Sequence, residues 1–375
     1  MSHSKQADYV IAGAGVYGSA VAWHLAKRGA DVVLLDAREV ATQASGGPGR
    51  RGVRANGRDM RELPLMRDAY ARWPTLHEAL GAAPFYERVG QLLVAETEQD
   101  VCTAEAQLWL QRHHNIATDW LSKEALLERE PRLTSNVRGA LLCPLDGVAK
   151  HADVTRAYAD AAARLGVDVR TNTRVTDIAT AHGRANAVMT SDEEWLGARK
   201  GVFVLTNSHV ASLLAPWVSL PVWNACLQVL VSTRLDHVPF AHLIGHLSRT
   251  ISLKPEAIDQ IMLSGGWPGQ WNLAEEVGAV LPASLQGNVD EAVALIPALR
   301  DLQIAEADAS HQESIAIDRI PIIDTVPGVD GLWFACGWSG HGWAIAPTVA
   351  ELLADWAGTD EQPELLRPFA LSRFD

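Results

Sequence analysis

Short apolar runs alternate with glycine-rich or polar turns along the first forty residues. Tyr9–Ala12 and Asp31–Asp36 are rich in β-forming residues and predict two buried strands. The segment between them, from Ser19 to Arg28, carries the alanine and leucine positions of a helix. Gly29 follows where a left-handed residue commonly ends a helix. This order predicts a strand, a helix and a second strand.

The turn between the first strand and the helix has the spacing G-x-G-x-x-G. Gly13 allows a tight turn, Gly15 lets the backbone approach a pyrophosphate, and Gly18 lets the helix pack closely on the strand. Asp36 ends the second strand, where a carboxylate accepts hydrogen bonds from an adenosine ribose and disfavours the 2′-phosphate of NADP. The pattern indicates a dinucleotide site and leaves FAD and NAD as alternatives.

A similar pattern recurs near the C-terminus. Gly331–Cys336 predicts a strand, Gly337–Trp343 a glycine-rich turn, and an apolar helix follows. Because proline is tolerated only in a first helical turn, Pro347 places the start of this buried helix between residues 344 and 346. A helix N-terminus stabilises the negative charge of a reduced flavin, which a nicotinamide does not need. This second turn favours FAD over NAD.

A second glycine-rich segment, Ala41–Arg54, contains four glycines and three arginines in its last ten residues. Ser45 and the glycine amides could hold a pyrophosphate, and an arginine can bind a carboxylate with two hydrogen bonds. The alternative interpretation is a solvated surface loop. We favour an anion site, since the segment follows the dinucleotide pattern by one strand.

Composition narrows the function classes. The 375 residues are 48% apolar and 21% charged, which is typical of a globular chain. The length predicts two or three domains, or one large domain with an insertion. The net charge of −13 disfavours nucleic acid and anionic membranes as partners. The four cysteines have no zinc or iron–sulfur spacing, so we expect buried reduced thiols and no metal site.

We expect a cytoplasmic protein without a membrane span. The N-terminus, Met1 to Asp8, is polar and has no apolar signal core. No stretch approaches the roughly 18 apolar residues needed to cross a bilayer.

These motifs together resemble the D-amino-acid-oxidase-like superfamily of FAD-dependent oxidoreductases, and most closely its branch of sarcosine oxidases, glycine oxidases and dye-linked proline dehydrogenase β-subunits. The segments that carry the resemblance are Ala12–Gly18, Ala44–Gly46, Gly52–Arg54, Val89–Leu93 and Gly337–Gly342, with looser similarity at Ile296–Arg300 and Pro321–Asp324.

The resemblance implies an α/β fold of mixed α+β character, with two interleaved domains. A Rossmann-like FAD-binding domain would comprise residues 1–80, 147–216 and 315–375. A mixed-sheet substrate-binding domain would comprise residues 81–146 and 217–314. The sequence agrees with a helix over 151–165 and strands at 168–171 and 201–205.

The resemblance also implies a set of cofactor-binding residues. Val175 would contact adenine through its backbone, and Asn207 stands where the family has a glycine, which asparagine can replace in a left-handed turn. The full set is Gly13, Gly15, Val16, Tyr17, Gly18, Asp36, Ala37, Arg38, Ser45, Gly46, Arg50, Val175, Asn207, Gly337, Gly340, His341, Gly342 and Trp343.

Three catalytic residues follow from the same motifs. Arg54 is similar to the family arginine that binds the substrate carboxylate, Arg51 to its partner near the flavin, and His341 to the histidine beside the isoalloxazine ring. A satisfied core histidine is the alternative for His341. Lys254 could assist in removing the amine proton, although we favour a solvated lysine there.

Tryptophan is enriched, with 13 residues against 6 phenylalanines and 5 tyrosines. Gln91, Trp267 and Trp271 are the first candidates for the substrate lining. Three others are expected in core or interface packing: Trp23, Trp73 and Trp109.

Three departures from the sarcosine oxidase pattern modify this picture. His311 stands where some relatives attach flavin to a cysteine, so we expect non-covalent FAD. Ala344 replaces a lysine that clamps the carboxylate, and the oxygen-activating lysine is replaced near Leu263. These changes favour electron transfer to an acceptor other than O₂, or a larger substrate.

The hypothesis is an FAD-dependent amine oxidase or dehydrogenase. It oxidises the C–N bond of a secondary or N-substituted amino acid to an imine by hydride transfer to flavin N5, with O₂, a partner subunit or a dye-type compound as acceptor. One alternative is the β-type flavin subunit of a hetero-oligomeric dehydrogenase of proline, hydroxyproline, sarcosine or an opine. Assembly as a homo-oligomer is a further alternative. Others are a D-amino-acid dehydrogenase, a non-catalytic flavoprotein and a nicotinamide dehydrogenase.

Overall fold

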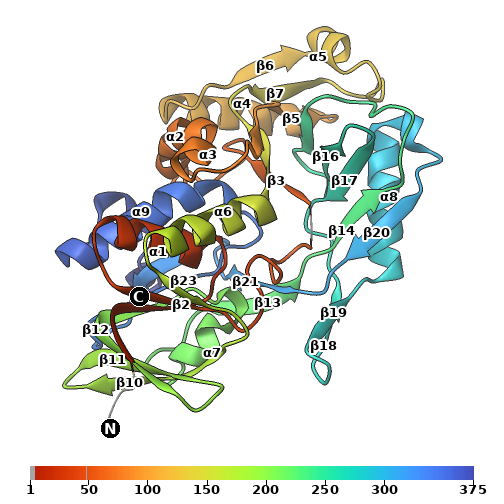
Figure 1. The fold of residues 1–375 in the computed structure, drawn as a ribbon. Coiled ribbons are helices and arrows are strands. Elements are labelled where there is room, and N and C mark those ends of the chain that lie inside the picture. The colour runs from red at the N-terminus through yellow and green to blue at the C-terminus, as the bar shows by residue number, and fades with distance from the viewer. Residues whose placement is uncertain (1–4, 48) are drawn as a thin grey trace.

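The apolar run at the start of the chain forms the central strand of a large mixed sheet. A computed structural model describes residues 5–47 and 49–375 (Figure 1). The predicted polar N-terminus, Met1 to Asp8, lies partly outside the described residues. Strand β1 (Lys5–Ala12) pairs in parallel with β2 (Val32–Leu35) on one side and with β12 (Trp195–Val204) on the other. The parallel pairing places the ends of β1, β2 and β12 at the same edge of the sheet.

The other strands of this eight-stranded sheet come from two later parts of the chain. They are β9 (Asp168–Arg170), β10 (Val175–Ala181), β11 (Arg184–Thr190), β22 (Ile322–Thr325) and β23 (Leu332–Cys336). β23 extends the parallel part of the sheet beyond β12, and β22 and β23 are antiparallel. The C-terminal turn therefore begins at the same sheet edge as the N-terminal one.

Three helices pack together on one face of this sheet (Figure 1): α1 (Val16–Lys27), α6 (His151–Arg164) and α9 (Ala346–Thr359). The first begins three residues earlier than its composition predicts, because Gly15 is its extended N-cap residue. The last begins at residue 346, within the predicted range, with Pro347 in its first turn. The shorter α7 (Val210–Leu214) packs on the opposite face.

A second eight-stranded sheet is built from two separated segments. Its order is β20 (Ile304–Asp308), β14 (Val229–Ser232), β17 (Gln260–Ser264), β16 (Ser252–Ala257), β15 (Leu243–His246), β5 (Gln91–Ala95), β7 (Gly139–Cys143) and β6 (Asp119–Ser122). β5 and β15 pair in parallel, which joins the two segments at the centre of the sheet. Helices α4 (Glu98–His113), α5 (Lys123–Arg129) and α8 (Pro282–Leu295) pack around it.

Smaller elements lie between and beside the two sheets. β3 (Arg50–Val53) pairs with β8 (Gly147–Lys150), which also pairs with β4 (Tyr86–Glu87), and β13 (Val222–Cys226) pairs with β21 (Gln312–Ala316). A hairpin of β18 (Gln270–Asn272) and β19 (Val277–Ala279) projects at one end (Figure 1). Helices α2 (Leu63–Arg72) and α3 (Leu76–Ala79) follow β3. Single 3₁₀ turns occupy Trp73–Thr75, Asn207–His209, Pro297–Leu299, Gly342–Ile345, Glu364–Phe369 and Leu371–Phe374.

The structure confirms the mixed α/β class and corrects two local expectations. Cys102 is exposed rather than buried, and Trp109 is exposed rather than packed in the core, so that interface packing of Trp109 stays a prediction. The residues are seven positions apart on α4, so both lie on the outward side, while Ala104 and Gln111 fill the inward side. In the described part of the chain, no helix is long and apolar enough to cross a membrane.

Candidate active site

A cavity of about 1460 Å³ runs from the turn after β1 to the inner strands of the second sheet. It is larger than the ~300–1,000 Å³ usual for a small ligand. Both the dinucleotide turn and the strands around Lys254 line it. The space therefore suits a large cofactor together with a small substrate.

The turn after β1 has the geometry that its glycines require. Gly13 has a φ of +100°, and a Cβ atom on it would lie 2.6 Å from the carbonyl oxygen of Leu205. A Cβ atom on Gly18 would lie 1.8 Å from the carbonyl oxygen of Gly13. Nothing lies within 4 Å of the same position on Gly15, so the backbone there is open to a ligand.

Asp36 fixes the neighbouring turn through backbone hydrogen bonds. Its carboxylate accepts from the N–H of Ala14 at 2.7 Å and from that of Arg38 at 2.9 Å. Burial raises the pKa of Asp36, and these two bonds oppose the rise. The carboxylate stands at the end of β2 and lines the cavity, where the sequence pattern places a ribose.

The arginine-rich segment is a strand rather than a loop, and its arginines diverge. Arg51 lines the cavity, and its Nη2 donates to the carbonyl oxygen of Gly46 at 2.6 Å. Burial lowers the pKa of Arg51 to about 10. Arg50 points away and pairs with Glu87 at 3.0 Å, outside the cavity. Successive side chains in a strand face opposite sides, so Arg50 is removed from the predicted cofactor set.

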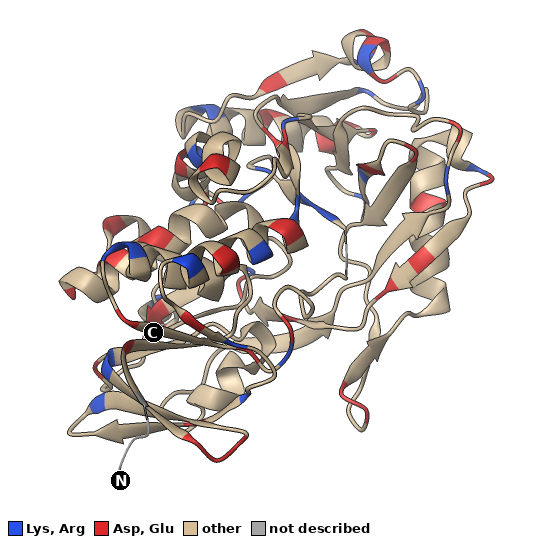
Figure 2. Ribbon diagram, viewed as in Figure 1, with Lys and Arg blue, Asp and Glu red and all other residues tan. Residues whose placement is uncertain are grey.

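Arg54 follows this strand and also lines the cavity. In Figure 2 the basic residues of β3 lie between the first large sheet and the second. Its Nη1 donates to the carbonyl oxygen of Asn56 at 3.0 Å. Burial and the charge of Arg58 lower the pKa of Arg54.

A buried carboxylate that sequence reasoning missed holds the backbone after Arg54. Asp146 accepts from the N–H of Ala55 at 2.7 Å and of Asn56 at 3.3 Å, and from the Tyr70 hydroxyl. Burial raises the pKa of Asp146 to about 6.

The C-terminal turn contacts the first turn of α1 directly. Trp338 stacks on Tyr17 with ring centroids 3.8 Å apart and an interplanar angle of 9°. The Tyr17 hydroxyl donates to the carbonyl oxygen of Gly342. Two predicted cofactor motifs, more than 300 residues apart, thus form one wall.

His341 lines the cavity and is held by the protein at both ring nitrogens. Nδ1 lies 3.2 Å from Glu62 Oε1, and Nε2 lies 3.0 Å from the carbonyl oxygen of Arg319. Glu62 pairs with Arg58 at 2.8 Å, and Arg58 and His341 lower the pKa of Glu62 against the effect of burial. His341 is therefore a cavity residue with a fixed ring.

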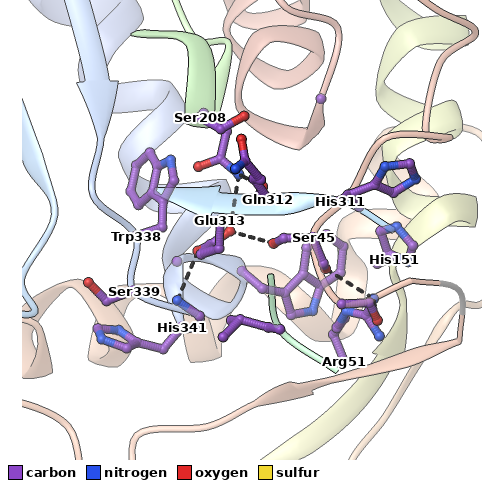
Figure 3. Close-up of a pocket in the computed structure, with 18 of the residues that line it drawn as sticks. Ser45, Arg51, His151, Ser208, His311, Gln312, Glu313, Trp338, Ser339 and His341 are labelled. Atoms are coloured by element: carbon purple, nitrogen blue, oxygen red, sulfur yellow. Dashed lines mark hydrogen bonds between the residues drawn. The ribbon is translucent and has the colours of Figure 1, made fainter. Parts of the chain in front are cut away.

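Glu313 on β21 joins three of the predicted motifs, and sequence reasoning missed it. Its carboxylate accepts from the N–H of Gly340 at 2.8 Å, from Asn207 Nδ2 at 3.0 Å and from the Ser45 hydroxyl (Figure 3). Asn207 has the left-handed φ of +49° that its replacement of a glycine predicts. The sequence patterns single out His311, two residues earlier, as a position near the flavin, but not Glu313 itself.

The remaining predicted positions fall into two groups. Gly18 and Gly337 support the turns from behind: a Cβ atom on Gly337 would lie 2.9 Å from that of Ala316. The others line the cavity directly: Val16, Ala37, Arg38, Ser45, Gly46, Val175, Gly340, Gly342 and Trp343.

The cavity wall contains buried polar atoms that lack a hydrogen-bond partner among the described residues. They are Gln91 Oε1, Gln107 Oε1, His151 Nε2, Thr206 Oγ1, both polar side-chain atoms of Gln228, and Trp343 Nε1. Buried polar groups without partners are costly, and a bound ligand or ordered water would supply hydrogen bonds to these atoms. Together with the open backbone at Gly15, they fit a flavin dinucleotide.

On the substrate side, the structure corrects the expectation for Lys254. This lysine is only 4% exposed and lines the cavity, so it is not solvated. Gln91 and Trp271 also line the cavity, whereas Trp267 donates to the carbonyl oxygen of Thr250 instead. Leu263 lies in the core of the second sheet.

Comparisons with known proteins give one consistent result. The profile of the DAO family, described as FAD dependent oxidoreductase, matches residues 8–356. The sarcosine oxidase subunit beta of Rhodobacter capsulatus is 25% identical over 391 residues, covering 99% of this chain and 89% of that protein. The glycine oxidase of Geobacillus kaustophilus is 26% identical over 390 residues, covering 98% and 97%.

Solved structures agree in fold. The L-proline dehydrogenase of P. horikoshii has a TM-score of 0.88 at 21% identity, covering 99% of this chain and 98% of that one. The Geobacillus kaustophilus glycine oxidase has a TM-score of 0.87 at 24% identity, covering 99% of each chain.

Proposed function

The chain belongs to the DAO family of FAD-dependent oxidoreductases, and on that premise we propose that it oxidises the C–N bond of a secondary or N-substituted amino acid to an imine. The observation that carries the proposal is one continuous cavity, lined at one end by the dinucleotide turn and at the other by Arg54. The matched family confirms the predicted FAD dependence and oxidoreductase class. The substrate and the roles of individual residues are our proposal.

Arg54 binds the substrate carboxylate in this proposal. A guanidinium forms two parallel hydrogen bonds to a carboxylate, and a partly buried one discriminates strongly for an anion. This contact fixes the adjacent carbon relative to the cofactor. FAD, when bound, supplies a two-electron acceptor at N5.

The cavity residues around the cofactor have separate roles. The backbone at Gly15 and the Ser45 segment hold the pyrophosphate, and Asp36 holds the ribose. Arg51 places a buried positive charge close to the glycine-rich segment. The fixed side chain of His341 lies beside the isoalloxazine ring of the flavin. The nearby positive charges also lower the pKa of the substrate amine, which must lose a proton before oxidation.

We assign the cofactor-binding and substrate-binding domains with the boundaries predicted from the sequence. The first sheet with α1, α6 and α9 is the FAD-binding domain, and the second sheet is the substrate-binding domain. Non-covalent binding is supported by His311, which lines the cavity where some relatives have a cysteine. The replacement of two family lysines, one by Ala344 and one near Leu263, supports an acceptor other than O₂ or a larger substrate.

A second candidate is the β-type flavin subunit of a hetero-oligomeric dehydrogenase. It is favoured by the similarity to sarcosine oxidase subunit beta over nearly the whole chain. The β18–β19 hairpin also presents an apolar side chain, Leu273, that is 82% exposed. A D-amino-acid dehydrogenase differs from the main proposal in the stereochemistry of the substrate and in acting on a primary rather than an N-substituted amine.

Anaerobic flavin bleaching tests the proposal. The purified yellow protein is mixed with sarcosine, glycine, L-proline, L-hydroxyproline, an opine and D-amino acids, and the loss of absorbance near 450 nm is followed. Rapid bleaching by an N-substituted amino acid supports the main proposal, and subsequent addition of O₂ or a dye identifies the acceptor. Bleaching only in the presence of a co-encoded subunit supports the second candidate, and bleaching by none of these contradicts both.

A further inference from the structure

We propose that Lys254 is the acceptor of the substrate amine proton, which makes it a catalytic residue of the cavity. The inference rests on the proposed amino-acid oxidation.

The second sheet places the Lys254 amine inside the cavity. Lys254 lies on β16 directly opposite Met262 on β17, and opposite residues of paired strands have neighbouring side chains. Met262 Sδ lies 3.8 Å from Arg51 Nη1, so this face of the sheet meets the arginine strand. Lys254 Nζ donates to Ser264 Oγ at 2.9 Å.

The charges around Lys254 disfavour its protonated form. Arg51 on β3 and Arg54 directly after that strand lower the pKa of Lys254, whereas Glu256, on the same strand as Lys254, raises it. The facing positions of β17, Met262 and Ser264, are uncharged. The neighbouring β15 carries His246, which lies 3.4 Å from Glu96 rather than toward the lysine.

No carboxylate forms an ion pair with Lys254 in the part of the chain that the structure describes. Burial, followed by the charge of Arg51, lowers the pKa of Lys254 to about 7. A neutral amine is therefore well populated near neutral pH.

A neutral Lys254 has the lone pair that proton transfer requires. Its own N–H bonds to Ser264, while the lone pair accepts the hydrogen of a substrate ammonium anchored through its carboxylate at Arg54. The substrate N–H bond breaks and a new Nζ–H bond forms. The electron pair left on the substrate nitrogen forms the C=N bond while the adjacent carbon loses hydride to the two-electron acceptor that FAD supplies. Lys254 later returns its proton to water.

The protonation state is measured directly by NMR. The chain has six lysines, so labelling them with ¹³C at Cε gives few signals, and the Lys254→Met variant identifies the one that disappears. We expect that signal to titrate near pH 7 in the FAD-loaded protein. A midpoint in the ordinary lysine range overturns the proposal, whatever the enzyme activity.

Anaerobic stopped-flow reduction tests the role. In the wild type, the rate constant at saturating substrate falls about tenfold per pH unit below the Lys254 midpoint. Lys254→Met, with Lys254→Gln as a second variant, reduces the rate at pH 7 about 10²-fold or more. The rate recovers at high pH, where the substrate amine is already neutral.

Lys200→Met is the matched control, because Lys200 is exposed, pairs with Asp8 and lies outside the cavity. A Lys254 variant with an unchanged pH profile, or with a raised KM and an unchanged limiting rate, overturns the proton-acceptor role and leaves the proposed function standing. Failure of every amino acid to reduce the wild-type flavin instead removes the proposed function, and this inference with it.

Discussion

Arg50 lies on β3 and Arg54 directly follows that strand, and their different surroundings give a matched pair of variants. Arg54 lines the cavity with a desolvated guanidinium, while Arg50 pairs with Glu87 outside it. A charge-assisted hydrogen bond contributes about 1.5–3 kcal/mol. Arg54→Ala is therefore expected to raise the substrate KM about 10- to 100-fold, measured by steady-state kinetics with the substrate identified by bleaching.

Arg50→Ala is the control and should leave KM within about twofold of the wild type. Arg54→Lys should give an intermediate value, because it retains the charge and loses the two-pronged geometry. A KM that hardly changes in Arg54→Ala excludes this arginine as the carboxylate anchor.

Glu313 gives a second residue-level prediction. Its carboxylate accepts hydrogen bonds from Ser45, Asn207 and the Gly340 N–H, and a glutamine offers a single acceptor oxygen in its place. Glu313→Gln is expected to loosen these three segments and to raise the Kd of FAD about tenfold, measured by fluorescence titration of the apoprotein. Glu306→Gln, at an exposed position on β20, should not change the Kd. Equal or tighter FAD binding by Glu313→Gln contradicts the bridging role.

At the scale of elements, the contact between α1 and the C-terminal turn decides the shape of the cofactor wall. Trp338 packs flat on Tyr17, whose hydroxyl also reaches Gly342. The stack therefore couples the N-terminal turn of the chain to the start of α9. Loss of the ring costs more than loss of the hydroxyl, because the buried side chain leaves a cavity.

Tyr17→Phe is expected to lower the free energy of unfolding by about 1 kcal/mol, and Tyr17→Ala by about 3–5 kcal/mol, measured by denaturant unfolding of the apoprotein. Both variants should bind FAD more weakly, in the same order. Two variants of equal stability would show that the stack does not hold these elements together.

The elements also show which local signals were sufficient. The glycine turn, the Gly29 stop and the position of Pro347 were predicted correctly, since each depends on backbone conformations that neighbouring residues dictate. The strand β3 was not predicted. Its sequence of arginines and glycine has no apolar period, and its pairing partner β8 lies nearly 100 residues later.

At the scale of the whole molecule, buried histidines make folding sensitive to acid. Burial lowers the pKa of His24 and His151 to about 3 and that of His246 to about 4. An unfolded histidine titrates near pH 6.5, so between pH 6.5 and about 3 the unfolded chain binds more protons than the native one. The free energy of unfolding must therefore decrease as the pH falls through this range.

The prediction is a steady loss of Tm from pH 6.5 to 4.5, before most carboxylates titrate, measured by thermal unfolding at constant ionic strength. His24→Gln should reduce the slope of Tm against pH, while His182→Gln, at an exposed position, should leave it unchanged. Identical slopes in all three proteins contradict this origin of acid sensitivity.

The dinucleotide turn, the C-terminal turn, the family and the choice of FAD follow from the amino-acid order alone, because each rests on short segments with strong local conformational requirements. Which side chains meet in the cavity depends on the three-dimensional arrangement of distant segments. This arrangement turned Arg50 away, buried Lys254 beside two arginines, and brought Glu313 to Ser45, Asn207 and Gly340. These contacts depend on pairing between strands far apart in the chain, such as β5 with β15, and on the side of the sheet that each residue then faces.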